Sequence, residues 1–104
     1  MTIIMQGATQ TLEITLPSSI DLAEANIYFS IEQFEKTVFE KTGTDVSFEG
    51  STVYVSLGQI DTLSLQEGNA KVQVNVTQDN GATRIPTYEA PVKVLRNQIP
   101  RVLA

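Results

Sequence analysis

The 104-residue sequence contains no cysteine, no histidine and no tryptophan. Without cysteine, the chain can form no disulfide and offers no thiolate for catalysis or metal binding. Without histidine, it lacks the side chain that proteins most often use as a general base and as a zinc ligand. We therefore expect no catalytic residue, no metal site and no cofactor.

Long apolar runs are also missing from the sequence. No stretch approaches the roughly 20 apolar residues that cross a membrane as a helix. The first residues, Met1–Gln6, carry no positive charge and no long apolar core, so they do not resemble a signal peptide. The expectation is a protein with no membrane partner that is not secreted by a signal peptide.

Positive charge is scarce and unevenly placed. The net charge is −5, and binding to nucleic acid depends on a basic field, so we expect no nucleic-acid partner. Residues 1–91 carry −8, whereas residues 92–104 carry +3 from Lys93, Arg96 and Arg101. This basic C-terminal segment could dock on a neighbouring copy; the alternative is a solvated, frayed terminus.

Four segments of the chain alternate between apolar and polar residues: Leu12–Leu16, Ile27–Ile31, Val53–Leu57 and Val72–Val76. A period of two places every second side chain on one face of a strand. Turn residues recur between such segments about every 8–12 residues, as in immunoglobulin-like sandwiches. The pattern predicts an all-β protein, an immunoglobulin-like antiparallel β-sandwich of seven to nine short strands. We expect one sandwich domain over residues 1–96 and a C-terminal tail over residues 97–104.

Turn chemistry gives two more local predictions. Asp79-Asn80-Gly81 is the best hairpin signal, because Asn-Gly readily adopts positive φ angles. Pro86 and Pro91 cannot donate to a strand ladder, so they should confine the last strand to a sheet edge or a bulge.

The segment 58–65 is the hardest to assign. It should cross between sheets with its apolar side chains tucked inward, or form a short helical turn capped by Asp61. The apolar side chains concerned are Ile60, Leu63 and Leu65. Asp21 also lies in a loop, and two carboxylates about 5–10 Å apart would suit a hydrolase acting on sugars. Capping of turns by the two side chains is the expected role instead.

Tyrosines provide the basis for a second functional hypothesis. Tyr28 and Tyr54 fall on the polar sides of their segments and should face outward. If these aromatic rings gather on one face, the sandwich would be a carbohydrate-binding or adhesion module.

One ordered set of segments looks familiar: Gln6–Ile14, Ile20–Leu22, Ala25–Ser30, Val53–Leu57, Gln59–Leu63 and Val72–Asn80. This set resembles the small β-sandwich structural proteins of tailed phages and prophages, and is similar to the N-terminal domain of phage baseplate upper proteins. In that family a G-D-T turn precedes a strand, and a loop of the type L-T/D-L and a V-x-F-x-V/I strand follow. Here Ala8 replaces the aspartate of the turn, so Thr9 or the backbone alone must hold it.

The resemblance implies a non-enzymatic structural protein of the tail, baseplate or head–tail module, which acts through protein–protein assembly. Its partners would be copies of itself, as a homo-oligomer, or other phage structural proteins. Its location would be the virion, or the bacterial cytoplasm before assembly. Exposed strand edges and an apolar tail need covering, so we expect the interface to include Ile3, Met5, Arg96, Ile99, Arg101, Val102 and Leu103.

Overall fold

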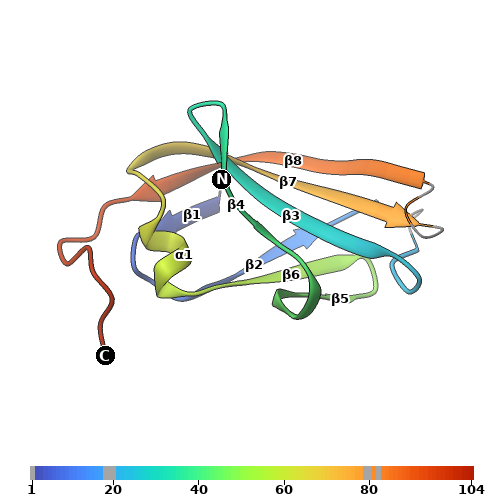
Figure 1. The fold of residues 1–104 in the computed structure, drawn as a ribbon, viewed down its shortest axis with the longest axis horizontal. Helices are drawn as coiled ribbons and strands as arrows, with labels where there is room; N and C mark the ends of the chain where they lie inside the picture. The colour runs from blue at the N-terminus through green and yellow to red at the C-terminus, as the bar shows by residue number, and fades with distance from the viewer. Residues whose placement is uncertain (1, 18–20, 79–80, 82) are drawn as a thin grey trace.

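In a computed structural model, the chain forms two β-sheets packed face to face, with one short helix at one end (Figure 1). The structure describes residues 2–17, 21–78, 81 and 83–104. The five-stranded sheet has the order β1-β8-β7-β3-β4, and the three-stranded sheet has the order β2-β6-β5. The elements are β1 (Thr2–Met5), β2 (Gln10–Thr15), β3 (Asn26–Gln33), β4 (Lys36–Lys41), a 3-10 turn (Gly43–Asp45), β5 (Val46–Glu49), β6 (Thr52–Leu57), α1 (Gln59–Leu63), β7 (Gly68–Gln78) and β8 (Thr83–Leu95). The β-rich, two-sheet prediction is thus confirmed.

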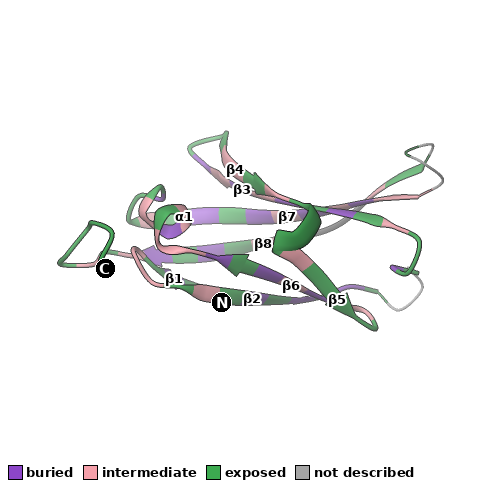
Figure 2. Ribbon diagram, turned by 60° about the horizontal axis from the view of Figure 1, so that its bottom comes forward, coloured by how far each residue is buried: buried purple, intermediate pink, exposed green. Residues whose placement is uncertain are grey.

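The core lies between the two sheets and follows the alternation of the sequence. Along β7, Val72, Val74 and Val76 are buried, whereas the residues between them reach the surface (Figure 2). Residues of β2 and β6 face them from the other sheet, and all join one apolar cluster. Burial of these side chains, each worth roughly 1.5–3 kcal/mol, is the main force that holds the sheets together.

One strand pair departs from the antiparallel prediction. β1 runs parallel to β8, with Thr2 beside Val92 and Met5 beside Leu95. The reason is that the chain leaves β1 by a turn at Gly7, whose φ of +81° suits glycine, and then crosses to the other sheet as β2. A backbone hydrogen bond closes the turn, from the Ala8 N–H to the Met5 carbonyl oxygen over 3.2 Å, and the Thr62 hydroxyl donates to the Ala8 carbonyl oxygen over 2.9 Å.

The two prolines of β8 lie where a strand can tolerate them. β1 accompanies β8 only from Val92 onward, so in the described part of the chain Thr83–Pro91 has β7 on one side and a free edge on the other. Pro86 also adjoins a register shift, because Tyr88 pairs with Val74 but Pro86 pairs with Asn75. Both prolines therefore lie at a sheet edge, and Pro86 also lies beside a bulge, as predicted. The predicted hairpin residues Asp79 and Asn80 lie outside the described residues.

The segment after β6 contains a helix. The Asp61 carboxylate accepts a hydrogen bond from the Gly58 N–H over 2.7 Å, so the expected cap is present at the start of α1. Leu65 is buried as predicted, but burial of Ile60 was wrong, since 74% of Ile60 is exposed. A short helix at the end of a sandwich turns only one side inward, and here that side carries Thr62.

Candidate interaction surface

Five segments meet at one end of the sandwich: the end of β1, α1, the β3–β4 turn, the end of β8 and the tail (Figure 1). Side-chain amides connect them. Gln33 donates to the Gln66 carbonyl oxygen and accepts from the Gln66 N–H, both over 2.8 Å. The Gln6 side chain donates through Nε2 to the Leu65 carbonyl oxygen over 2.7 Å, and the Gln6 backbone N–H donates to the Leu95 carbonyl oxygen over 3.0 Å. This end is therefore a connected platform and not a set of independent loops.

The tail is tied to this platform. Leu103 donates its N–H to Gln59 Oε1 over 2.8 Å, and its carbonyl oxygen accepts from Gln59 Nε2 over 2.9 Å. Asn97 donates its N–H to Gln6 Oε1 over 3.4 Å, and its own Oδ1 accepts from the Ile99 N–H over 2.9 Å. The tail thus lies beside α1 with a defined path.

The segments that form this platform expose apolar side chains. Seven large ones are exposed there, and together we call them the apolar end: Ile3, Met5, Phe34, Ile60, Ile99, Val102 and Leu103. Five belong to the interface predicted from the sequence. Exposed apolar residues grouped at one place, in contrast to scattered ones, mark interaction surfaces.

Phe34 sits on the tip of a strained turn. The β3–β4 hairpin has a two-residue loop, Phe34-Glu35, with φ angles of +53° and +63°. Asn-Gly is the usual choice for such a loop, because side chains other than those of glycine and asparagine are disfavoured in the left-handed region. The turn nevertheless presents Phe34 to solvent, with 71% of the residue exposed.

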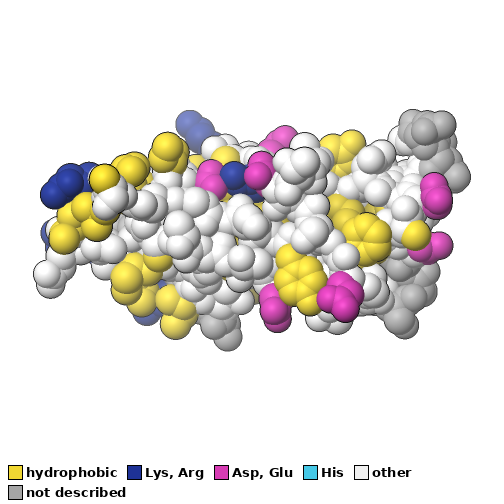
Figure 3. All heavy atoms as spheres, turned by 90° about the horizontal axis from the view of Figure 1, so that it is seen from below, with side chains coloured by type: hydrophobic (Ala, Val, Ile, Leu, Met, Phe, Trp, Pro, Cys, Tyr) yellow, Lys and Arg dark blue, Asp and Glu magenta, His cyan; other side chains and the backbone are white. Residues whose placement is uncertain are grey.

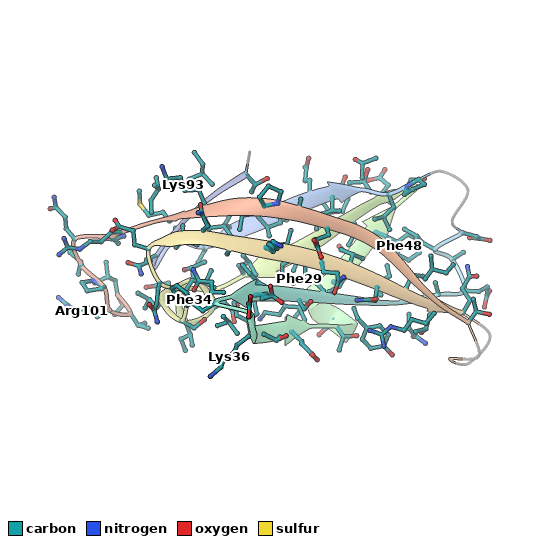
Figure 4. All side chains as sticks on the ribbon, turned by 90° about the horizontal axis from the view of Figure 1, so that it is seen from above. Phe29, Phe34, Lys36, Phe48, Lys93 and Arg101 are labelled. Atoms are coloured by element: carbon teal, nitrogen blue, oxygen red, sulfur yellow. The ribbon has the colours of Figure 1, made fainter. Side chains whose placement is uncertain are left out.

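Charge differs between the two ends of the molecule. The exposed Arg96 and Arg101 adjoin the apolar end, whereas Glu24, just before β3, and Glu49, at the end of β5, lie at the opposite end. Figure 3 shows dark blue side chains at the tail end and magenta ones at the other, with side chains of both colours also between the two ends. Phe48, half-exposed beside Glu49, adds an apolar side chain toward the acidic end (Figure 4).

The two loop carboxylates considered from the sequence both cap turns. Asp21 Oδ1 accepts from the Ala23 N–H over 3.0 Å, and Asp61 accepts from Gly58. They lie at opposite ends of the sandwich, Asp21 before β3 and Asp61 in α1 (Figure 1), so one substrate cannot reach both. Over residues 2–17, 21–78, 81 and 83–104 no three acidic side chains cluster as a metal site would need. None of the helices in these ranges could span a bilayer.

Asp61 also forms an ion pair that joins α1 to the five-stranded sheet. Lys41 Nζ on β4 lies 2.8 Å from Asp61 Oδ2, and both side chains are largely buried. Burial raises the pKa of Asp61, but the hydrogen bonds from Lys41 and from the Gly58 N–H, with the charge of Lys41, outweigh it. The net effect is a pKa below the ordinary value of 3.8.

We expect Asp61→Asn to lower the free energy of unfolding by about 1 kcal/mol at neutral pH. Because folding lowers the pKa of Asp61, the stabilisation by its carboxylate is complete above the pKa that Asp61 has in the unfolded chain, about 3.9. This stabilisation is lost as the pH falls through the pKa of Asp61 in the folded protein. Urea denaturation at neutral and at strongly acidic pH should therefore show a difference between variant and parent that shrinks in acid. Asp45→Asn is the control, because the exposed Asp45 lies 4.0 Å from Lys41 Nζ and should matter little. A pH-independent difference for Asp61→Asn would contradict this role.

The two tyrosines proposed for a glycan platform do not share a face. Tyr28 alternates with buried residues on β3 of the five-stranded sheet, and Tyr54 does so on β6 of the three-stranded sheet. Both therefore point outward, from opposite sides of the sandwich. A binding site that uses both rings is excluded by this arrangement.

A scan of the chain against models of protein families found no matching family, and a search among curated proteins found no match either. The similarity to phage baseplate proteins therefore stays a prediction based on the motifs given above.

Proposed function

We propose that this chain is a non-enzymatic structural protein of a phage or prophage virion, in the tail, baseplate or head–tail module, and that it works by assembling with copies of itself. The observation that carries the proposal is the apolar end, with seven exposed large apolar residues on a hydrogen-bonded platform. The exposure of so many apolar side chains to water at one end of the molecule is unfavourable. Their burial against a protein partner would remove this unfavourable exposure.

The charge distribution favours a head-to-tail contact between copies. The basic, apolar end of one molecule, with Arg96 and Arg101, complements the acidic end of the next, with Glu24, Glu49 and the half-exposed Phe48. Contacts between two different surfaces build rings where the rotation closes and filaments where it does not. Complementary charge also steers the encounter and fixes its orientation.

We further propose that the sandwich is immunoglobulin-like. In variable-type immunoglobulin domains, one sheet contains the neighbouring strands B, E and D, and the other contains G, F, C and C′. The orders β2-β6-β5 and β8-β7-β3-β4 support the same arrangement in this chain. The disulfide of antibody domains has no counterpart, because the chain contains no cysteine.

The strained hairpin provides the test of assembly. Replacing Phe34 by Asn and Glu35 by Gly gives the turn its preferred residues, and should stabilise the fold by about 1 kcal/mol, or roughly 4–8 °C in Tm. The same change removes an exposed aromatic residue from the apolar end, so self-association should weaken. Thermal unfolding and light scattering measure the two effects.

Glu35→Gly alone is the matched control. It relieves one of the two strained positions but keeps Phe34, and it removes an acidic side chain from the basic end, so it should raise the Tm without weakening association. If the double variant associates as strongly as the parent, Phe34 has no part in the contact and the proposal loses its support.

A further inference from the structure

The outer face of the five-stranded sheet carries an open groove of about 350 Å³. Figure 4 looks onto this face. Strand register places Tyr28 beside Asn75 and Ser30 beside Gln73 along the floor, which β3 and β7 form. The groove shares no lining residue with the apolar end, and no step of the proposed assembly uses it.

Two opposite charges border this floor. Glu40 belongs to β4 and Arg84 to β8, so β3 and β7 lie between them. Neighbouring strands are about 4.8 Å apart, so three strand spacings separate the backbones of Glu40 and Arg84. This separation prevents a direct ion pair between the two side chains. Together Glu40 and Arg84 carry no net charge, but each side chain can still form hydrogen bonds with a ligand.

The floor has unused hydrogen-bonding capacity. Within the described part of the chain, the Gln73 amide and the Ser30 hydroxyl make no side-chain hydrogen bond to protein, and Asn75 Oδ1 accepts only one long bond, 3.4 Å, from Arg84 Nε. Each amide offers two donors and an acceptor, and each hydroxyl can do both. Tyr28 adds a ring that is 41% exposed.

This chemistry selects a class of ligand. An apolar ligand would need an apolar lining, whereas among the described lining residues Phe29 is fully buried and Tyr28 alone exposes a ring. An anion or a nucleic acid would need net positive charge, and the groove has one charge of each sign. What remains is a neutral ligand that is rich in hydroxyls and has a C–H face to lie against an aromatic ring.

We propose that this groove binds a neutral oligosaccharide. Tyr28 contacts the face of a sugar ring, and Asn75, Gln73, Glu40 and Arg84 exchange hydrogen bonds with its hydroxyls. The volume lies at the lower end of the roughly 300–1,000 Å³ typical of ligand sites, which suits one or two sugar rings in a shallow, open site. A single tyrosine serves here, in contrast to the paired tyrosines considered from the sequence.

NMR titration of the ¹⁵N-labelled full chain tests the proposal, with maltotriose, cellotriose and tri-N-acetylchitotriose as probes. We expect at least one of them to give saturable shifts at Tyr28, Ser30, Gln73 and Asn75, including the two side-chain amides. Tyr28→Ala should weaken that binding by about tenfold. Tyr54→Ala is the matched control, because it removes the same side chain from the outer face of the other sheet, and should leave binding unchanged.

Two results would overturn the saccharide site: no saturable shift with any of the three sugars, or shifts that persist at full strength in Tyr28→Ala. Neither result bears on assembly, which is measured as molecular mass without sugar. Conversely, a protein that stays monomeric would leave the groove and its titration unaffected.

Discussion

Removal of residues 96–104 is expected to convert the assembled protein into a monomer. The deletion takes away Arg96, Arg101 and the three apolar tail residues Ile99, Val102 and Leu103, which are about half exposed. It leaves every strand intact, because β8 ends at Leu95. The lost contacts with the body are the hydrogen bonds from the tail to Gln59 and Gln6. Light scattering on the full chain beside the chain ending at Leu95 gives the two masses.

A second variant separates loss of contact from loss of fold. Replacing Ile99, Val102 and Leu103 by serine in the full chain keeps the length, the backbone hydrogen bonds and both arginines, and removes only apolar surface. It should also shift the equilibrium toward monomer, with an unchanged circular dichroism spectrum. An assembly that survives both changes would place the contact elsewhere on the molecule.

Phe29→Ala is expected to cost about 3–5 kcal/mol of unfolding free energy. Phe29 lies in the middle of β3, is fully buried, and packs against the Phe39 ring with centroids 6.5 Å apart. It pairs with Val74 of β7 on one side and with Lys41 of β4 on the other, so the cavity would open at the centre of the larger sheet. Domains of this size are stable by about 5–15 kcal/mol in total, and the variant would keep only part of that.

Phe48→Ala is the matched control for this prediction. Phe48 is the same residue type on a strand, but it is half-exposed at the sheet surface, and its removal should change stability by about 0.5 kcal/mol or less. Chemical denaturation of both variants measures the difference. Equal losses for the two variants would show that the core does not lie where the structure places it.

The strands and the core could be predicted from the sequence because one physical rule governs both. In segments such as Ile27–Ile31 and Val72–Val76, a period of two identifies the strand and its buried face together. That rule does not say which strands are neighbours. The parallel pairing of β1 with β8 depends on the turn at Gly7 and on where β2 packs, and both are long-range outcomes.

The apolar end could be predicted only in part. Tail residues such as Val102 stand out because apolar side chains at a chain end have no strand pattern to bury them. Ile60 was assigned to the interior, since a five-residue helix is too short to show which side faces inward. Phe34 is not among the residues predicted for the interface, although its position between two polar residues, Gln33 and Glu35, indicates exposure.

Charge reversal at the two ends of the molecule tests the head-to-tail contact. One variant carries Arg96→Glu and Arg101→Glu, and the other carries Glu24→Lys and Glu49→Lys. Each alone should sediment as a monomer at low salt, because like charges then meet in every contact. Mixed in equal amounts, they should assemble again, since each restores the complement of the other. Loss of assembly in the arginine variant only, with no recovery on mixing, would contradict a head-to-tail contact between copies.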